Sequence, residues 1–139
     1  MNFEHRCTVP VARGTLWDFL MDVQQMALCV PGTSEVVVKE GGQEEEYTGR
    51  IRVKVGPIGL TLQGVMMIQE RDPQTWRIMA HAEAYDRRVG GGVFLKANIS
   101  LGENGSDETE LTIASEARLM GKLGEFGQAI IRRKADAIV

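Results

Sequence analysis

The sequence predicts an α+β fold in which a curved antiparallel sheet of about seven strands wraps around one long C-terminal helix. The middle of the chain alternates apolar and polar residues in a series of short segments, which is typical of half-buried strands. Turn signals such as Gly41-Gly42 and Asn104-Gly105 separate these segments. The end of the chain instead places its apolar residues at helical spacing. Successive hairpins imply an antiparallel sheet with one apolar face, on which that helix can lie.

The N-terminal part of the chain is expected to form one strand and a broken helix. Residues 3–9 alternate apolar and polar side chains, and Pro10 ends this strand. Residues 15–28 carry apolar side chains at helical spacing, and Asp22 is expected to divide this helix into two short pieces. Pro31 disfavours helical geometry in the residue before it and Gly32 suits a turn, so the helix is expected to end there.

Six further strands are expected at residues 35–39, 46–55, 60–68, 76–82, 93–101 and 111–117. Tight turns at Gly56-Pro57, Asp72-Pro73 and Asn104-Gly105 connect neighbouring strands. The run Gly90-Gly91-Gly92 is either a flexible turn at the mouth of a cavity or an ordinary hairpin turn.

The chain closes on an amphipathic helix, expected from Leu119 to Val139. Gly124 and Gly127 lie inside it and weaken it by about 1 kcal/mol each relative to alanine. Two interpretations remain open. The glycines either allow the helix backbone to pack closely on the sheet, or they loosen its N-terminal turns so that this end lifts from the sheet.

Length and composition fit one soluble domain covering residues 1–139, since 139 residues suffice for a core without disulfide bonds. A net charge of −3 gives no electrostatic reason to expect nucleic acid as a partner. Cys7 and Cys29 form no disulfide framework and are expected to be free, buried thiols. The chain shows neither a secretion signal nor a run long enough to span a membrane, which favours a cytoplasmic protein.

A single helix covers only part of the apolar face of such a sheet, which leaves room for a ligand cavity. Small residues expected to face inward favour empty space there: Gly64, Ala80, Ala82, Ala97 and Ser115. We expect an apolar ligand to contact Tyr47, Val53, Leu62, Met66, Trp76, Ile78, Ala80, Ala97, Ile113, Leu123, Phe126 and Ile130.

Catalysis and metal binding have little support in the sequence. His5 and His81 are the only histidines, and neither is expected on the face of Ser115, the one conceivable inward-facing nucleophile. The cysteines and histidines lack the spacing of metal ligands, so neither a metal nor another cofactor is expected. The sequence therefore favours a protein that is not an enzyme.

Several motifs along the whole chain match a known family in order and spacing. They are Val9-Pro10-Val11, residues 16–22, Cys29-Val30-Pro31-Gly32, Lys54-Val55-Gly56-Pro57 and Gly121-Lys122-Leu123-Gly124. On these motifs the chain resembles the family of the carbon monoxide dehydrogenase G subunit (CoxG), within the START/Bet v 1-like (SRPBCC) helix-grip superfamily. The resemblance implies the same strand–helices–six strands–helix order that the residue patterns predict.

The resemblance also implies a function. Members of the family are associated with molybdenum hydroxylases of the carbon monoxide dehydrogenase type and are implicated in bringing them to the cytoplasmic membrane. They are also implicated in handling a lipid or quinone in the cavity, so the expected location is cytoplasmic or peripheral at the inner membrane face. Many members continue past this helix into a variable tail with a membrane-anchoring segment. The alternatives are a helix-grip enzyme of the polyketide cyclase or hydratase type, and a structural recruitment module with a filled cavity.

The turn around Pro57 is a candidate contact point for a partner protein or a membrane. Pro57 fixes its backbone while Gly56 and Gly59 relax theirs, which makes a rigid turn bearing the apolar Ile58. In one interpretation Ile58 only caps the core. In the other, Pro57, Ile58 and Gly91 form the contact.

Overall fold

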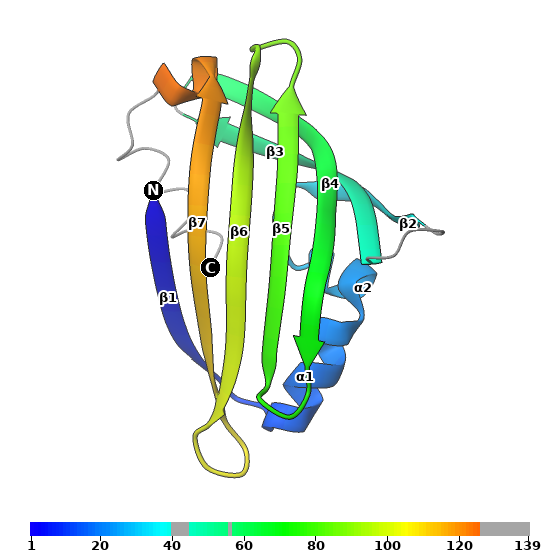
Figure 1. The fold of residues 1–139 in the computed structure, drawn as a ribbon, viewed down its shortest axis with the longest axis vertical. Helices are drawn as coiled ribbons and strands as arrows, with labels where there is room; N and C mark the ends of the chain where they lie inside the picture. Colours follow the sequence, from blue (N-terminus) through cyan, green and yellow to red (C-terminus); the bar gives the residue numbers. More distant parts are fainter. Residues whose placement is uncertain (40–44, 56, 126–139) are drawn as a thin grey trace.

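A single antiparallel sheet dominates the computed structural model, which describes residues 1–39, 45–55 and 57–125 (Figure 1). The order across the 7-stranded sheet is β1-β7-β6-β5-β4-β3-β2. Each strand from β2 to β7 pairs with its neighbours in sequence, and β1 pairs with β7. The predicted meander of antiparallel strands is confirmed, with β1 and β2 at the two edges.

The strands occur in the predicted order, and most are longer than the alternating segments that predict them. They are β1 Asn2–Val9, β2 Thr33–Lys39, β3 Glu45–Val55, β4 Ile58–Asp72, β5 Arg77–Asp86, β6 Gly91–Glu103 and β7 Thr109–Gly121. Hydrogen bonds between neighbouring strands extend the sheet into residues whose side chains do not alternate.

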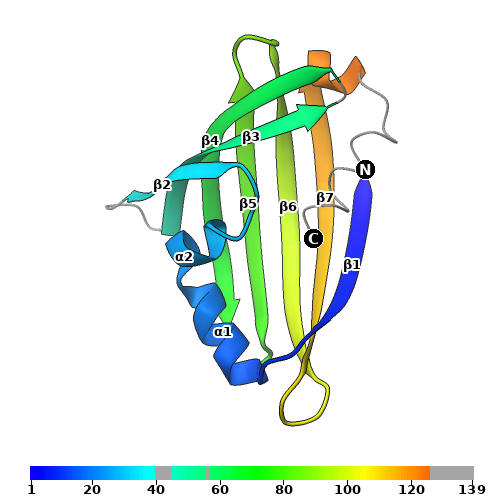
Figure 2. The same cartoon turned by 180° about the vertical axis from the view of Figure 1, so that it is seen from behind.

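Two short helices, α1 (Arg13–Met21) and α2 (Val23–Ala27), follow β1 and confirm the predicted broken helix. Asp22 forms the break, and its carboxylate accepts a hydrogen bond from the backbone amide of Gln25 at 3.2 Å. This bond caps the N-terminus of α2. Figure 2 shows both helices on the concave face of the sheet, beneath β2 and β3 in that view.

The sheet curls strongly at β3 and β4, which cross over the concave face in Figures 1 and 2. Gly64 of β4 lies in this region and pairs with Gly49 of β3 and Ala84 of β5. A Cβ atom at Gly64 would clash with the carbonyl oxygen of Glu83 and stand 2.6 Å from the Cα of Ala84. Glycine therefore permits the close approach of β4 to β5 that the curl requires.

Two apolar clusters pack on the concave face. The lower cluster, nearer α1, is built on the buried Leu16, Trp17, Ile78 and Leu101. The upper cluster, beneath the crossing strands, is built on Leu60, Leu62 and Leu123. Trp76 joins the lower cluster by meeting Trp17 edge to face, with 5.5 Å between the ring centroids. Each cluster closes one end of the curved sheet.

The start of the predicted C-terminal helix is wrong. Leu119 and Met120 belong to β7, where they pair with Val93 and Gly92 of β6. Gly121 then turns the chain with a φ of 61°, and a 3₁₀ helix, η1, covers Lys122–Glu125. The strand continues because β6 offers backbone partners as far as Gly91, and apolar residues suit a strand as well as a helix. The remainder of the predicted helix lies outside the described residues.

Two smaller expectations also need correction. Cys7 and Cys29 are free, as predicted, but both are exposed rather than buried. Only Gly90 of the run Gly90-Gly91-Gly92 belongs to the turn, where it has a φ of 78°. Gly91 and Gly92 are buried residues at the start of β6. A Cβ atom at Gly91 would stand 2.8 Å from the backbone nitrogen of Leu123, so that position is required for packing.

Candidate functional site

An apolar cavity of about 320 Å³ lies between α2 and the curled part of the sheet. Its lining residues come from α2, the α2–β2 connection and strands β2 to β6. They are Val23, Met26, Ala27, Val30, Thr33, Val36, Tyr47, Thr48, Gly49, Arg50, Ile51, Leu62, Gly64, Val65, Met66, Ala82, Glu83, Ala84 and Leu95. The volume falls at the lower end of the range typical of small-molecule sites.

Small residues on the sheet leave this space open. Gly49 of β3, Gly64 of β4 and Ala84 of β5 are paired across neighbouring strands. Ala82 lies two residues before Ala84 on β5. The guanidinium of Arg50, at the cavity margin, lies 3.5 Å from the carboxylate of Glu35. The curl that Gly64 permits therefore also shapes the floor of the cavity.

The other wall of the cavity is formed by α2 and the edge strand β2. The side-chain amide of Gln24 on α2 donates a hydrogen bond to the carbonyl oxygen of Val36 on β2, at 3.2 Å. Around this link, Leu28 is 74% exposed and Val37 is 55% exposed. These two exposed residues follow the lining residues Ala27 and Val36 in the sequence.

Tyr47 connects the apolar cavity to a polar network. Its hydroxyl donates a hydrogen bond to the carboxylate of Glu45, and the same carboxylate oxygen accepts one from Arg71. Arg71 also reaches the carbonyl oxygen of Met21 at the end of α1, at 3.4 Å. Burial of the hydroxyl raises the pKa of Tyr47, and the hydrogen bond to Glu45 raises it further.

A second depression, of about 390 Å³, adjoins the cavity at Val23 and Tyr47. Val23 and Tyr47 line both spaces. The other residues of the second depression are Asp18, Met21, Asp22, Gln24 and Val38, several of which are polar and exposed. Tyr47 and Val23 therefore lie between an apolar space and one with a more polar lining.

Of the predicted cavity residues, the structure brings Tyr47, Leu62 and Met66 together around this cavity. Trp76 and Ile78 belong instead to the lower cluster, and Val53 and Leu123 to the upper one. Ala80 is buried within the sheet and Ile113 is half-buried on β7.

Ala97 lines a separate depression of about 440 Å³, shared with residues of the convex face such as Lys96 and Glu116. Phe126 and Ile130 lie outside the described residues. The sequence prediction missed the contribution of α2 and β2. The spacing of Val23, Met26, Ala27 and Val30 carried the signal for an apolar helix face.

The predicted partner contacts have different environments. Pro57 is exposed at the β3–β4 turn, and Ile58 begins β4, with its side chain outside the described part of the structure. Gly91 is buried, so it offers no surface to a partner.

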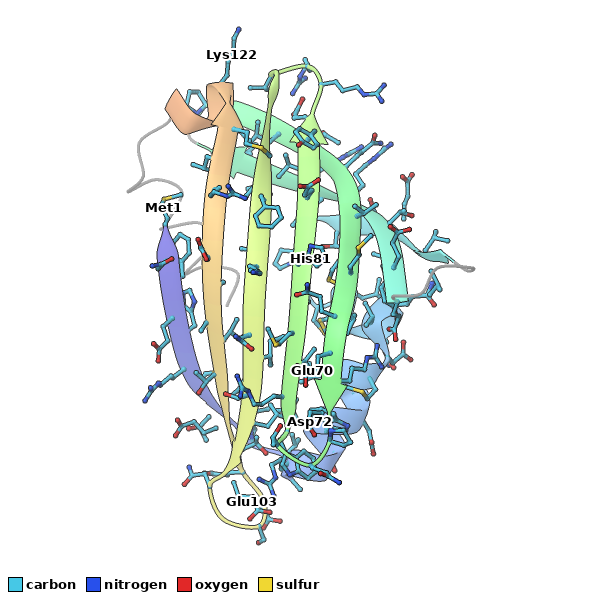
Figure 3. All side chains as sticks on the ribbon, viewed as in Figure 1. Met1, Glu70, Asp72, His81, Glu103 and Lys122 are labelled. Atoms are coloured by element: carbon cyan, nitrogen blue, oxygen red, sulfur yellow. The ribbon has the colours of Figure 1, made fainter. Side chains whose placement is uncertain are left out.

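The relation between His5 and Ser115 differs from the sequence prediction. Phe3 pairs with Ser115 and His5 pairs with Ile113, which puts His5 and Ser115 on the same face of the sheet at adjoining positions. His81 lies on the convex face, where Figure 3 labels it, and its ring tilts against Phe94 at 6.4 Å. Within residues 1–39, 45–55 and 57–125, no group of three or more His, Cys, Asp or Glu side chains could hold a metal ion.

Charged side chains are unevenly distributed along the sheet. A basic end, around the β3–β4 and β5–β6 turns, carries the exposed Arg52, Lys54, Arg87, Arg88, Arg118 and Lys122. Figure 3 shows Lys122 at this end and Glu103, Asp72 and Glu70 toward the other. Because the whole chain has a net charge of −3, the basic end is a local reversal of sign.

Hydrogen bonds hold the two turns of the basic end together. The Arg88 guanidinium donates to the carbonyl oxygen of Gly59 at 2.7 Å, which links the β5–β6 turn to β4. Asp86 accepts from the amides of Thr61, Arg88 and Val89 at 2.8, 2.8 and 3.1 Å. These bonds hold the β5–β6 turn against β4. Among the helices of the described residues, none is long and apolar enough to cross a membrane.

Comparison with known proteins supports one family. The family model for the carbon monoxide dehydrogenase G subunit (CoxG) matches residues 6–139. No curated protein matches the chain. A conserved protein from Geobacillus kaustophilus is similar in structure, with a TM-score of 0.85, 17% identity, and coverage of 99% of this chain and 87% of the other.

Two enzymes also share the architecture. An aromatase/cyclase from a Streptomyces species has a TM-score of 0.63 and 22% identity, covering 100% of this chain and 84% of the other. A norcoclaurine synthase from Thalictrum has a TM-score of 0.63 and 13% identity, covering 99% and 91%. At these identities the likeness concerns the fold alone. The predicted helix-grip, START/Bet v 1-like fold class is confirmed, whereas residues 126–139 of the predicted C-terminal helix are outside the described residues.

Proposed function

Because the chain belongs to the family of the carbon monoxide dehydrogenase G subunit (CoxG), we propose that it is a non-catalytic accessory protein that binds an apolar ligand, a lipid or a quinone, in the cavity beside Tyr47. In this proposal it works in the cytoplasm, at the inner face of the membrane, and helps to recruit a molybdenum hydroxylase there.

The apolar cavity is the observation that carries the proposal. Its lining consists mainly of aliphatic side chains and glycine backbone, which suits the burial of hydrocarbon. The curl at Gly64, the helix α2 and the edge strand β2 all contribute to it. The exposed Leu28 and Val37, next in sequence to the lining residues Ala27 and Val36, suit a ligand that arrives from an apolar environment.

The basic end supports the recruitment part of the proposal. Arg52, Lys54, Arg87 and Lys122 are exposed on turns and strand ends, where they can approach an anionic surface without rearrangement. Basic residues near an anionic leaflet each contribute about 1 kcal/mol to membrane association. The exposed Pro57 lies on the same side of the molecule, at the turn between β3 and β4.

One observation favours a second candidate, an enzyme of the cyclase or hydratase type. His5 and Ser115 share a face of the sheet at adjoining positions, which is an arrangement from which a base and a nucleophile can act together. The candidate differs from the accessory role in one respect that can be measured, because it requires His5 for activity.

Ligand binding can be tested by replacing Ala82, which lines the cavity floor, with a bulky side chain. The purified chain is extracted with organic solvent, and the extract is analysed by mass spectrometry for apolar molecules. We expect wild-type protein to carry a lipid or quinone and Ala82→Phe to carry little of it. Ala114→Phe is the matched control, because Ala114 is exposed on the convex face. Equal loading of Ala82→Phe and wild type would contradict the proposal.

A further inference from the structure

We propose that the convex face of the sheet, over β5, β6 and β7, is an interface at which two copies of this chain pack face to face as a symmetric dimer. Figure 1 shows these three strands nearly straight and side by side, with α1 and α2 behind them. Two sheets pack in this way with their strands within about 30° of each other. The inference does not depend on the proposed function, because the apolar cavity lies on the concave side.

Two adjacent rows of side chains cross these strands on the convex face, where Figure 3 labels His81. The members of each row pair across β5, β6 and β7, and all the charged ones are exposed. The first row is Glu83, Phe94 and Arg118, and the second row is His81, Lys96 and Glu116. The first row is therefore positive at β7 and negative at β5, whereas the second row is negative at β7 and positive at β6.

A two-fold axis that runs across the strands between the two rows makes this face complementary to itself. Each strand then faces the same strand of the second copy, running in the opposite direction. Arg118 faces Glu116 of the second copy, and the symmetry produces this contact twice. Phe94, which is half-buried, faces the aliphatic stem of Lys96. The guanidinium of Arg118 lies 4.9 Å from the ring of Phe94 in its own chain, which holds the cation in place for the contact.

Other positions of this axis along the strands lose the match. An axis through the first row places Arg118 opposite Arg118 of the second copy, and one through the second row places Lys96 opposite Lys96, so that like charges repel. An axis one row further toward either end brings no opposite charges together over β5, β6 and β7. The charge pattern therefore selects a single register for the dimer.

The same register places a protruding ring over a depression. Tyr85 is 47% exposed, and its ring lies on Gly92 of β6, since a Cβ atom at Gly92 would stand 2.5 Å from it. Across the axis, Gly92 faces Asn98 of the second copy. Asn98 lines the convex-face depression of about 440 Å³, together with Met79 and Ala114. The Tyr85 ring of each copy can therefore fill the depression of the other, as a close-packed interface requires.

Polar groups at this contact also match. The Oδ1 atom of Asn98 is buried and has no hydrogen-bond donor among the described residues. The Tyr85 hydroxyl lies 3.9 Å from the sulfur of Met120, which is only a weak acceptor. The hydroxyl can donate to Asn98 of the second copy once that amide turns toward it. A buried acceptor without a donor destabilises the free chain, so the dimer is favoured by supplying one.

Sedimentation velocity of the full chain at low salt tests the dimer. A contact over three strands is smaller than the standard interface of about 800 Å² per partner, so we expect a weak dimer with a Kd on the order of 100 µM. Added salt should weaken it, because four of the facing side chains are exposed charges. Wild-type protein that remains monomeric at about 1 mM, roughly ten times the expected Kd, would overturn the inference and leave this face to a different protein.

Two charge-reversal variants give the sharpest comparison. Arg118→Glu opposes negative charges at both symmetric contacts, and Glu116→Arg opposes positive ones. We expect each variant alone to dimerise at least tenfold more weakly than wild type, about 1.4 kcal/mol. An equimolar mixture restores opposite charges at both contacts, so the mixed dimer should form with a Kd within about threefold of the wild-type value. A change in the fold of one chain cannot produce this rescue.

Glu110→Arg is the matched control, because it makes the same change of charge on the same face of β7 but outside the two rows. We expect it to dimerise like wild type. Tyr85→Ala removes the ring that fills the depression, and it should also weaken the dimer at least tenfold. Single charge variants that dimerise like wild type, or a mixture that dimerises no better than either variant alone, would overturn the inference.

Discussion

The carboxylate of Asp86, at the end of β5, accepts a hydrogen bond from the backbone amide of Thr61 on β4 at 2.8 Å. The same side chain accepts from the amides of Arg88 and Val89 in the following turn, and it is only 3% exposed. One buried carboxylate therefore joins the β5–β6 turn to the neighbouring strand. This arrangement fixes the position of Arg87 and Arg88 at the basic end.

Asp86→Ala should destabilise the protein by about 1–3 kcal/mol, since buried amides lose their acceptor. The hydrogen bond from Thr61, followed by that from Val89, lowers the pKa of Asp86 below its ordinary value of 3.8. The stabilisation is therefore fully present above that value and is lost as the pH falls through the lower pKa of the folded state. Urea unfolding should show a constant difference between wild type and variant above about pH 5 and a smaller one in stronger acid.

The exposed Asp107, in the β6–β7 turn, provides the control for this experiment. Asp107→Ala should change the free energy of unfolding by less than about 0.5 kcal/mol. An Asp86→Ala variant as stable as Asp107→Ala would show that the turn is held by other contacts.

Gly64→Ala should disturb the curl of the sheet. A Cβ atom at this position would clash with Glu83 and approach the Cα of Ala84, and both contacts are with backbone that has little freedom to move. We expect a loss of about 1–3 kcal/mol in the free energy of unfolding and weaker binding of an apolar dye. Gly59→Ala is the control, because nothing lies within 4 Å of a Cβ atom there. Equal stability of the two variants would mean that β4 can move away from β5.

The strands, the curl at Gly64 and the wall formed by α2 show what the sequence could and could not predict. Alternating residues and turn signals predicted the strands correctly, because each depends on neighbours in the chain. The curl at Gly64 depends on β5, which lies far along the chain, so a glycine predicted only to leave space also positions β3 over the concave face. The wall formed by α2 was missed for the same reason, although Val23 and Met26 have helical spacing.

His5→Ala should leave ligand binding and recruitment unchanged if the protein is not an enzyme. The variant and Ser115→Ala can be compared with wild type for ligand affinity and for the amount of hydroxylase recovered on membranes. A loss of 100-fold or more in biological activity in a folded His5→Ala variant, about 2.7 kcal/mol, would favour the cyclase or hydratase alternative. A similar loss in Ser115→Ala would strengthen that conclusion, because the two residues share one face.

The basic end should bind anionic vesicles in a salt-dependent manner. Replacing both Lys54 and Arg87 with glutamate reverses two exposed charges, and we expect a loss of about 2 kcal/mol or more in vesicle affinity at low salt. Co-sedimentation with vesicles of anionic and neutral lipids, at rising salt, measures the effect. Arg77→Glu is the control, since Arg77 is exposed at the opposite end of β5. Equal binding to neutral vesicles would contradict an electrostatic contact.

Gly91 and Gly124 lie on either side of the junction between the sheet and η1, and alanine should have opposite effects at the two sites. At Gly91 a Cβ atom would stand 2.8 Å from both the backbone nitrogen of Leu123 and the carbonyl oxygen of Met120. Gly91→Ala should therefore push Leu123 out of its buried position, and it should cost about 1–3 kcal/mol.

At Gly124 the nearest atom, the carbonyl oxygen of Leu119, would be 3.6 Å from the added Cβ, which is an ordinary contact. Among the described residues, close packing does not require glycine there. Gly124→Ala should stabilise the protein by up to about 1 kcal/mol, because alanine restricts the unfolded chain more than glycine does. Hydrogen exchange at Leu123 and Gly124 should slow in this variant. A lower melting temperature in Gly124→Ala would mean instead that this glycine serves packing that a Cβ atom disrupts.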